Sequence, residues 1–220
     1  MTLSPYVPPA TKLQRSLKQI DQDVLRMGTL VEQSFRLSHQ ALFSHNLEAI
    51  GQIATLERQI DAYYRQIELD CAKIITLQRP VALDLRLLNA FMHLVRDLER
   101  IGDYAQDLAE LAMKLASYSP HPCLSDIEEM SRNARVMLAA SLIALTELDA
   151  TAGRQVKVMD DLVDDAYDRL YQTLAEAKDI KGSVEPILLM VLVIRHLERM
   201  ADHATNIGQR VAYIVTGQRQ

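Results

Sequence analysis

Apolar residues recur at three- and four-residue steps along most of the chain, which is the period of an amphipathic α-helix. The first such stretch runs from Thr11 to about His45. Its apolar positions are Leu13, Leu17, Ile20, Val24, Met27, Leu30, Val31, Phe35 and Leu42. The alternation of β-branched and aromatic residues expected of strands is absent from the sequence. The pattern therefore predicts an all-α protein.

Caps and helix breakers divide the rest of the first half into two further helices. Asn46 is predicted to cap a second helix that ends near Leu77. Arg79-Pro80 breaks this helix, and the proline is expected in the first turn of a third helix that runs to about Ser117.

The second half begins after the one clear linker, residues 117–124, which is rich in serine and proline. The segment Ser125-Asp126-Ile127-Glu128 fits a capping box at the start of a fourth helix. A fifth helix is predicted from about Thr151 to Ile180. Lys181-Gly182-Ser183 is expected to form the next turn, with the glycine as a helix stop and the serine as the next cap. A sixth helix follows from about Val184 to Thr216.

The two halves share sequence as well as plan. Leu98–Ala105 (LERIGDYA) aligns with Leu197–Ala204 (LERMADHA), and Arg96 aligns with Arg195. Such internal duplication indicates two tandem three-helix bundles related by a pseudo-two-fold repeat. The predicted domains are a flexible N-terminal arm at 1–11, a first bundle at 12–118, a linker at 119–125 and a second bundle at 126–217.

Composition narrows the class of protein. With 220 residues, 49% of them hydrophobic, the chain can bury a core, which must be aliphatic because there is no Trp and only 5% of residues are aromatic. The net charge of −5 argues against nucleic acid as a partner. The N-terminus does not resemble a signal peptide, and the apolar run from Pro186 to Ile194 is too short to span a bilayer. Cys71 is expected in a helical core and Cys123 in an exposed linker, and a reduced, cytoplasmic protein is the default.

Acidic residues are placed symmetrically around the two predicted breaks. The equidistant pairs are Asp61/Glu99 and Glu57/Asp103 around position 80, and Asp164/Glu198 and Asp160/Asp202 around position 181. Antiparallel helices joined by short turns bring equidistant residues to the same height. Each half is therefore expected to place two carboxylates of one helix opposite two of the next. Gly102 and Ala201 are small enough to let the neighbouring helix approach closely.

Four converging carboxylates need compensation for their charge. They can bind protons at a raised pKa, pair with Arg or Lys, or bind a cation. Oxygen-only ligand sets suit hard ions such as Mg²⁺, Mn²⁺ or iron. The alternative is a solvated face with salt bridges from flanking arginines, namely Arg58, Arg100, Arg169 and Arg199.

Three segments of the chain resemble the family of the phosphate-uptake regulator PhoU. They are Glu99–Ala105 (ERIGDYA), Glu198–Ile207 (ERMADHATNI) and Arg79–Arg86 (RPVALDLR), and the similarity extends from about Leu13 to Gly217. The resemblance implies two PhoU-type bundles with metal clusters held by paired acidic motifs. Iron is the favoured metal, with Mg, Mn or Zn as alternatives.

Carried over by the resemblance, the metal ligands are Glu57, Asp61, Glu99 and Asp103 in one half, and Asp160, Asp164, Glu198 and Asp202 in the other. Two departures from the pattern affect this assignment. Asp107 stands where the second copy has Asn206, and Asp160 replaces the glutamate seen at position 57. The neighbouring pair Asp161/Asp165 competes with Asp160/Asp164 for the ligand role.

The resemblance also implies a regulatory role without catalysis. A PhoU-type protein connects a phosphate ABC transporter at the membrane to a sensor histidine kinase, and represses the phosphate-starvation response. A homodimer and peripheral association with the inner membrane are expected. The alternatives are an accessory protein of an inorganic-phosphate permease, and a di-iron carboxylate enzyme. The enzyme is disfavoured because residues 102 and 201 are not the histidines that its Glu-x-x-His motif requires.

Three histidines, His93, His196 and His203, could in principle bind metal. His196 aligns with Asp97 and His203 with Tyr104, so neither histidine is present in both copies, and the case for His93 as a metal ligand is no stronger. A structural role is the leading interpretation for all three.

Overall fold

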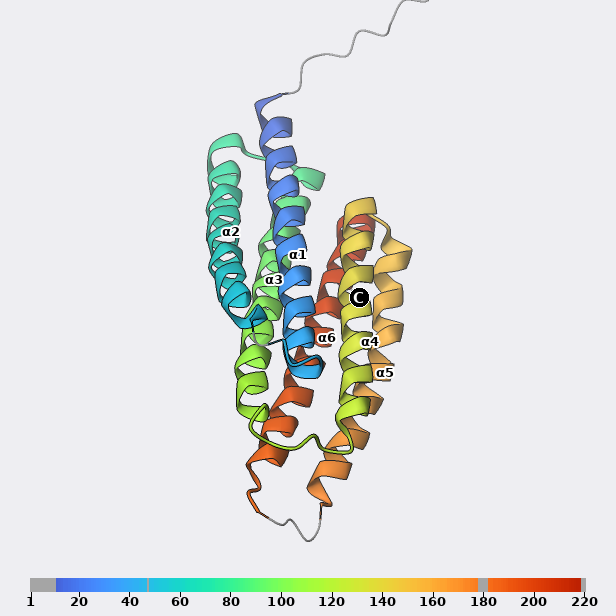
Figure 1. Cartoon of the computed structure of the whole chain (residues 1–220). Helices are drawn as coiled ribbons and strands as arrows, with labels where there is room; N and C mark the ends of the chain where they lie inside the picture. The colour runs from blue at the N-terminus through green and yellow to red at the C-terminus, as the bar shows by residue number, and fades with distance from the viewer. Residues whose placement is uncertain (1–10, 47, 178–181, 219–220) are drawn as a thin grey trace, which may run out of the picture.

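The computed structural model describes residues 11–46, 48–177 and 182–218, and all of its regular elements there are α-helices. They are α1 (Lys12–Phe43), α2 (Ala49–Gln78), α3 (Ala82–Leu115), α4 (Leu124–Glu147), α5 (Ala150–Ala175) and α6 (Glu185–Thr216). Helices α1, α2 and α3 pack on one another, and α4, α5 and α6 form the second bundle (Figure 1). The predicted all-α fold with two tandem three-helix bundles is confirmed.

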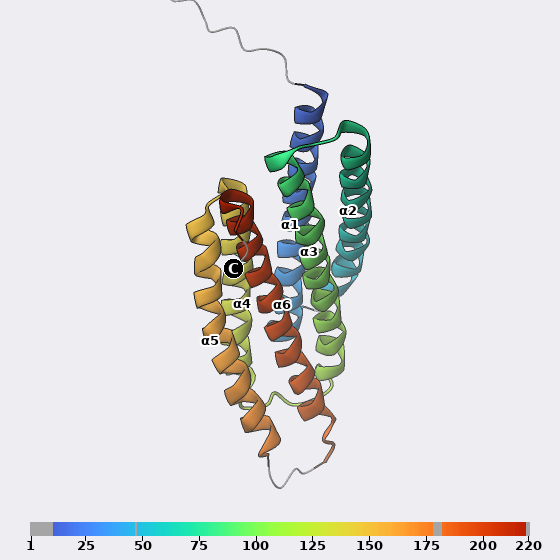
Figure 2. The same ribbon diagram turned by 180° about the vertical axis from the view of Figure 1, so that it is seen from behind.

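The two bundles meet mainly through α3 and α6, which lie side by side in the middle of the molecule, and α1 adds a smaller contact with α4 (Figures 1 and 2). One continuous apolar core runs through this contact, because both helices bury residues on the faces toward each other and toward their own bundles. Among the described residues, Phe35 and Phe91 are the only aromatic side chains that are fully buried, and the core is mainly aliphatic, as the lack of Trp predicts. Among the described residues, no helix is long and apolar enough to cross a membrane.

Two predicted helix starts are wrong. Asn46 does not cap α2; the cap position is Glu48, and Asn46 contributes only its carbonyl oxygen, 3.3 Å from the Ala49 nitrogen. The capping box at Ser125 does not form, because α4 starts two residues earlier than predicted, at Leu124, with Cys123 at the cap position and no side-chain cap.

The breaks that form the two hairpins also differ from the predicted ones. Pro80 lies before α3 rather than in its first turn, and it follows Arg79, the left-handed C-cap of α2 (φ 48°). This arrangement is common because proline cannot continue a helix. Helix α5 ends at Ala175, so Gly182 is not its stop. Ser183 Oγ accepts a hydrogen bond from the Glu185 nitrogen at 3.1 Å, close to its predicted capping role. The predicted arm up to residue 10 and Lys181 lie outside the described residues.

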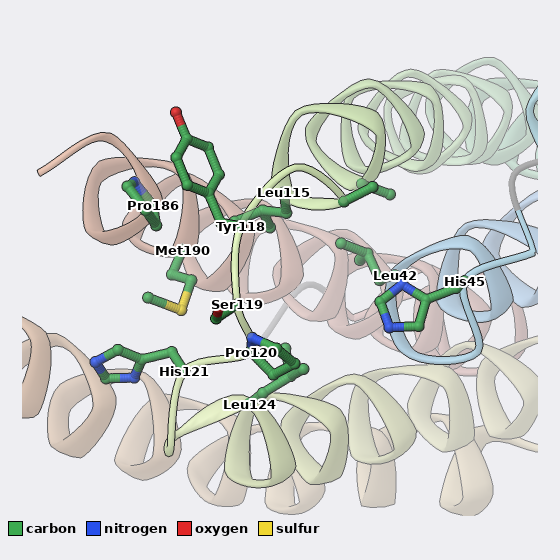
Figure 3. A pocket seen from close by; sticks show the side chains of 12 residues that line it. Leu42, His45, Leu115, Tyr118, Ser119, Pro120, His121, Leu124, Pro186 and Met190 are labelled. Atoms are coloured by element: carbon green, nitrogen blue, oxygen red, sulfur yellow. The ribbon is translucent and has the colours of Figure 1, made fainter. Parts of the chain in front are cut away.

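The linker is exposed at residues 117, 119, 120 and 122, while other side chains in it pack against the ends of four helices. Tyr118 and Pro120 border a small cavity of about 40 Å³ together with Leu42 of α1 and Met190 of α6 (Figure 3). Cys123 is buried here, with its Sγ 4.0 Å from Met190 Sδ, so the expectation that it is exposed is wrong. The linker thus buries one side chain, Cys123, within a segment whose serines and prolines are exposed.

Close backbone contact distinguishes the second bundle. A Cβ added to Gly153 of α5 would lie 2.4 Å from the carbonyl oxygen of Gly208 on α6, and the converse holds for Gly208. Only glycine fits at both positions, since real Cβ atoms do not approach an oxygen so closely. The equivalent of Gly208 in α3 is Ala109, which is buried in a small apolar cluster with Ile53 and Leu56. The second hairpin is therefore the tighter of the two at this level.

Candidate metal centres

Two antiparallel hairpins position the eight predicted ligands. The first carboxylate ring, on α2 and α3, contains Glu57, Asp61, Glu99 and Asp103. The second carboxylate ring, on α5 and α6, contains Asp160, Asp164, Glu198 and Asp202. In each ring, two acids of one helix face two acids of the next.

Apolar contacts one residue away from the acids fix this register. Ile60, beside Asp61, is buried, and its side chain packs on Gly102, beside Asp103. A Cβ at Gly102 would lie 3.2 Å from Ile60 Cδ1, so the small residue lets the two helices approach closely, as predicted. Val163 and Ala201 occupy the corresponding positions of the second bundle and are also fully buried.

The acids of the first ring affect one another across the two helices. Burial raises the pKa of Glu99, and the nearby carboxylates of Asp103 and Asp61 raise it further. Burial also raises the pKa of Glu57, to which Asp61 and Asp103 add. The pKa of Asp103 is raised by burial and by Asp61 and Asp107. These mutual effects confirm the predicted proximity of Asp61 to Glu99 and of Glu57 to Asp103.

Cations on the flanks of α2 and α3 balance part of this charge. Arg65 lies 2.7 Å from Asp61. Arg100 lies 3.5 Å from Glu99 and 3.3 Å from Asp103. Arg100 therefore forms the salt bridges that were predicted for it. Arg58 does not, and it donates a hydrogen bond to a threonine hydroxyl instead.

The second ring differs from the first in one deeply buried acid, Asp160, and in having more cations. The Asp160 side chain is only 2% exposed and is paired with Lys157 at 2.8 Å. Burial raises the pKa of Asp164, and the charges of Asp160 and Asp202 add to the effect. Because Asp202 acts on Asp164, the two sides of this ring are close as well.

The α6 side of the second ring carries two arginines. Arg195 binds Glu198 at 2.9 Å, and Arg199 binds Asp202 at 2.7 Å. Burial raises the pKa of Glu198, with smaller increases from Asp202 and Asp164. The predicted proximity of Asp164 to Glu198 is thereby confirmed. The competing acids Asp161 and Asp165 are exposed, and the charge of Asp161 also contributes to the raised pKa of Asp164.

The chemistry of the rings fits a hard cation only after rearrangement. In the part of the chain that the structure describes, no three His, Cys, Asp or Glu residues are arranged to hold a metal ion. Six of the eight carboxylates, all but Glu57 and Asp164, are paired with Arg or Lys among the described residues, so a metal ion would have to displace those side chains. In the carboxylate rings, one buried side-chain oxygen, Asp160 Oδ1, has no hydrogen-bond partner among the described residues. A buried carboxylate oxygen without a partner is costly, and a cation is one way to satisfy it.

The histidines lie at the contact between the bundles and not in the rings. His203 Nδ1 is 2.9 Å from Asp97 Oδ1, and His196 Nε2 is 3.9 Å from Asp107. The Tyr104 ring packs on His196, with ring centroids 5.2 Å apart. These contacts follow the repeat, since residues 97 and 104 of one copy correspond to 196 and 203 of the other. The offset of 99 residues between the two copies was the signal in the sequence that relates these contact residues to one another. Nothing in the sequence indicated that α3 and α6 are in contact.

The cysteines offer no reactive thiol. Cys71 is fully buried in the core, as predicted, and burial raises its pKa to about 12. Burial also raises the pKa of Cys123. Because the thiolate is the nucleophile and metal ligand, neither residue is activated for such chemistry.

Comparison with known proteins places this arrangement in a family. The PhoU domain family matches the chain twice, at residues 24–112 and 127–211. The chain belongs to the PhoU family. Each match covers one bundle with its carboxylate ring, so the family repeat coincides with the duplication seen in the sequence. PhoU proteins are accessory regulatory proteins and not known enzymes, in agreement with the prediction that this chain has no catalytic activity.

Relatives within the PhoU family are similar over nearly their whole length. The phosphate-specific transport system accessory protein PhoU homolog of Synechocystis sp. is 66% identical over 213 residues, which cover 97% of this chain and 95% of the relative. The homolog from Deinococcus radiodurans is 34% identical and covers 94% of this chain and 98% of its own. The crystal structure of PhoU from Pseudomonas aeruginosa superimposes with a TM-score of 0.87 at 29% identity, covering 94% of this chain and 100% of that chain.

Proposed function

We propose that this PhoU-family chain is a regulatory accessory protein of phosphate uptake that binds metal ions through its two carboxylate rings. The main support for the role in uptake is the 66% identity over 97% of the chain to a protein named as an accessory of the phosphate-specific transport system. In this role the chain acts as a cytoplasmic homodimer that associates with a phosphate ABC transporter at the inner membrane. It represses the starvation response through a sensor histidine kinase.

The support for metal binding is the paired geometry of the rings. Two hairpins bring acids of separate helices close enough to raise one another's pKa, and both repeats preserve this feature. Bound metal would relieve that repulsion, with the carboxylates of Glu99 and Glu198 among its ligands. It would supply positive charge between the two helices, while the protein side chains would only bind and orient it.

A complementation experiment tests the proposal. A strain that lacks the gene is expected to produce a phosphate-starvation reporter even in high phosphate, and the wild-type chain should restore repression. A Glu99→Gln, Glu198→Gln variant should fail to restore it. An Asp161→Asn, Asp165→Asn variant is the matched control, because these exposed acids lie outside the rings.

Two results would contradict different parts of the proposal. Full repression by the glutamine variant would separate regulation from the carboxylate rings. Failure of the wild-type chain to repress the reporter, with recovery of a phosphate permease and not the ABC transporter on purification, would favour the permease accessory role.

A further inference from the structure

A second polar site lies between the bundles, apart from the carboxylate rings. A cavity of about 500 Å³ opens between α3 and α6, the two helices at the centre of Figures 1 and 2. It is lined by His93, Arg96, Asp97, Arg100, Tyr104, Arg199, His203, Asn206 and Arg210. Small-molecule sites in proteins fall in the range of about 300–1,000 Å³. This volume would hold more than ten groups the size of water, at about 30 Å³ each.

The lining is basic although the protein is acidic. Four arginines and one acid, Asp97, border the cavity, and because Arg100 and Arg199 are paired with acids of the rings, Arg96, Arg210 and Asp97 leave a formal charge of +1 (2 − 1) with neutral histidines. The whole chain carries −5. Like charges gathered around one cavity raise its electrostatic potential and attract anions. The cavity is therefore a positive site on a negative protein.

Two of the arginines are available for a ligand. Among the described residues, no acid lies within ion-pair distance of Arg96 or Arg210, whereas Arg100 and Arg199 are held by acids of the rings. One carboxylate oxygen of the single acid of the cavity already has partners: Asp97 Oδ1 lies 2.9 Å from His203 Nδ1 and 3.5 Å from Asn206 Nδ2. Because a carboxylate only accepts hydrogen bonds, this contact uses lone pairs that would otherwise compete for the arginines.

We propose that the cavity between α3 and α6 binds a multiply charged anion through its phosphate groups. Guanidinium groups match phosphate oxygens in geometry and charge, and each can donate two parallel hydrogen bonds. The ligand contacts Arg96 of one bundle and Arg210 of the other, so its binding joins the two bundles. Free phosphate, a condensed phosphate and a nucleotide share this chemistry, and the cavity has room for the larger two. The site extends the proposed function but does not depend on metal in the rings.

Calorimetric titration of the full chain tests the site. Inorganic phosphate, tripolyphosphate and ATP are titrated separately in low-salt buffer with EDTA, which removes metal ions from the experiment. At least one of the three anions is expected to bind with a Kd below about 1 mM. The anion that binds most tightly identifies the source of the phosphate groups. An Arg96→Gln, Arg210→Gln variant should bind about a hundredfold more weakly, because two charge-assisted contacts are lost.

The matched control is an Arg15→Gln, Arg26→Gln variant, which removes the same charge from exposed positions on α1. It should bind like the wild type. Absence of binding in all three arms, or equal weakening in the control, would overturn the proposal. Because EDTA is present, either result would leave the metal proposal intact.

A second measurement does not depend on any variant. Phenylglyoxal modifies accessible arginines of the wild-type chain, and peptide mass spectrometry locates the modified sites. Whichever of the three anions binds most tightly in the titrations is expected to protect Arg96 and Arg210 but not Arg15 or Arg26. Equal modification of all four with and without that anion would also overturn the proposal.

Discussion

The two bundles carry the same acidic arrangement, but they compensate for its charge differently. In the first ring, Arg65 and Arg100 are the paired cations, and Asp107 adds a further acid nearby. In the second ring, the paired cations are Lys157, Arg195 and Arg199, and Asn206 stands in the place of Asp107. The first ring therefore keeps more uncompensated negative charge. Duplication preserved the positions of the acids while the surrounding cations diverged.

The hairpins that carry the rings differ in their packing as well. Helices α5 and α6 meet through Gly153 and Gly208, whose backbones touch. Ala109 takes the place of Gly208 in the first hairpin, where aliphatic side chains separate the helices. The second bundle should therefore tolerate added volume at this contact least.

The largest expected effect comes from breaking the glycine contact. Gly153→Val should lower the free energy of unfolding by about 3 kcal/mol or more, because the new side chain would force α5 away from α6. Gly51→Ala in α2 is the control, since nothing lies within 4 Å of its added Cβ. It should raise the free energy of unfolding by up to about 1 kcal/mol. Urea denaturation followed by circular dichroism measures both, and a similar loss in both variants would contradict the close contact.

The next effect concerns the buried acid of the second ring. Lys157→Met should cost about 1–3 kcal/mol of unfolding free energy in metal-free protein, because Asp160 is 2% exposed and would lose its cation. Lys73→Met in the first bundle removes the partner of the more exposed Asp70 and should cost under about 1 kcal/mol. Chemical denaturation at neutral pH compares the two. Equal costs would show that the burial of Asp160 does not matter.

The smallest stability effect is a pH dependence of the first ring. Burial and the nearby carboxylates raise the folded-state pKa of Glu99 above its ordinary value of 4.5, so its proton is bound more tightly in the folded protein. Its contribution to stability is therefore complete below pH 4.5 and is lost as the pH rises through the raised pKa. Glu99→Gln should stabilise metal-free protein at pH 7 by under about 1 kcal/mol, and the gain should vanish below pH 4.

A matched variant of the second ring sharpens this prediction. Glu198→Gln also removes an acid with a raised pKa, but it leaves Arg195 without its partner at 2.9 Å. The increase in the free energy of unfolding at pH 7 should therefore be smaller for Glu198→Gln than for Glu99→Gln. Denaturation of both variants between pH 4 and 8 measures the difference, and a larger gain for Glu198→Gln would contradict the unequal compensation of the two rings.

Much of the fold followed from sequence because the information is local. Helical periodicity, the repeat of Leu98–Ala105 at Leu197–Ala204 and the symmetry of the acids about positions 80 and 181 predicted both hairpins. The proximity of Asp61 to Glu99 could be predicted from their equal distances along the chain to position 80. Helix caps were less predictable. Asn46 and Ser125 are favoured cap residues, but neither caps a helix, and the first turns of α2 and α4 are held by backbone hydrogen bonds instead.

The cations and the contact between the bundles could not be predicted with the same success. Which flexible arginine pairs with an acid depends on small differences in side-chain geometry, so Arg58 and Arg100 looked equivalent in sequence. The packing of α3 on α6 joins residues about 100 positions apart, and no turn fixes their register. The basic cavity there depends on Arg210, which lies outside the repeated motif.

Metal analysis of the purified, untagged protein tests the central claim most directly. The account predicts that Glu99→Gln and Glu198→Gln each lose the metal of one ring, that the double variant loses nearly all of it, and that the Asp161→Asn, Asp165→Asn control keeps the wild-type content. Equal metal content in the wild type and the double variant would contradict metal binding by the carboxylate rings.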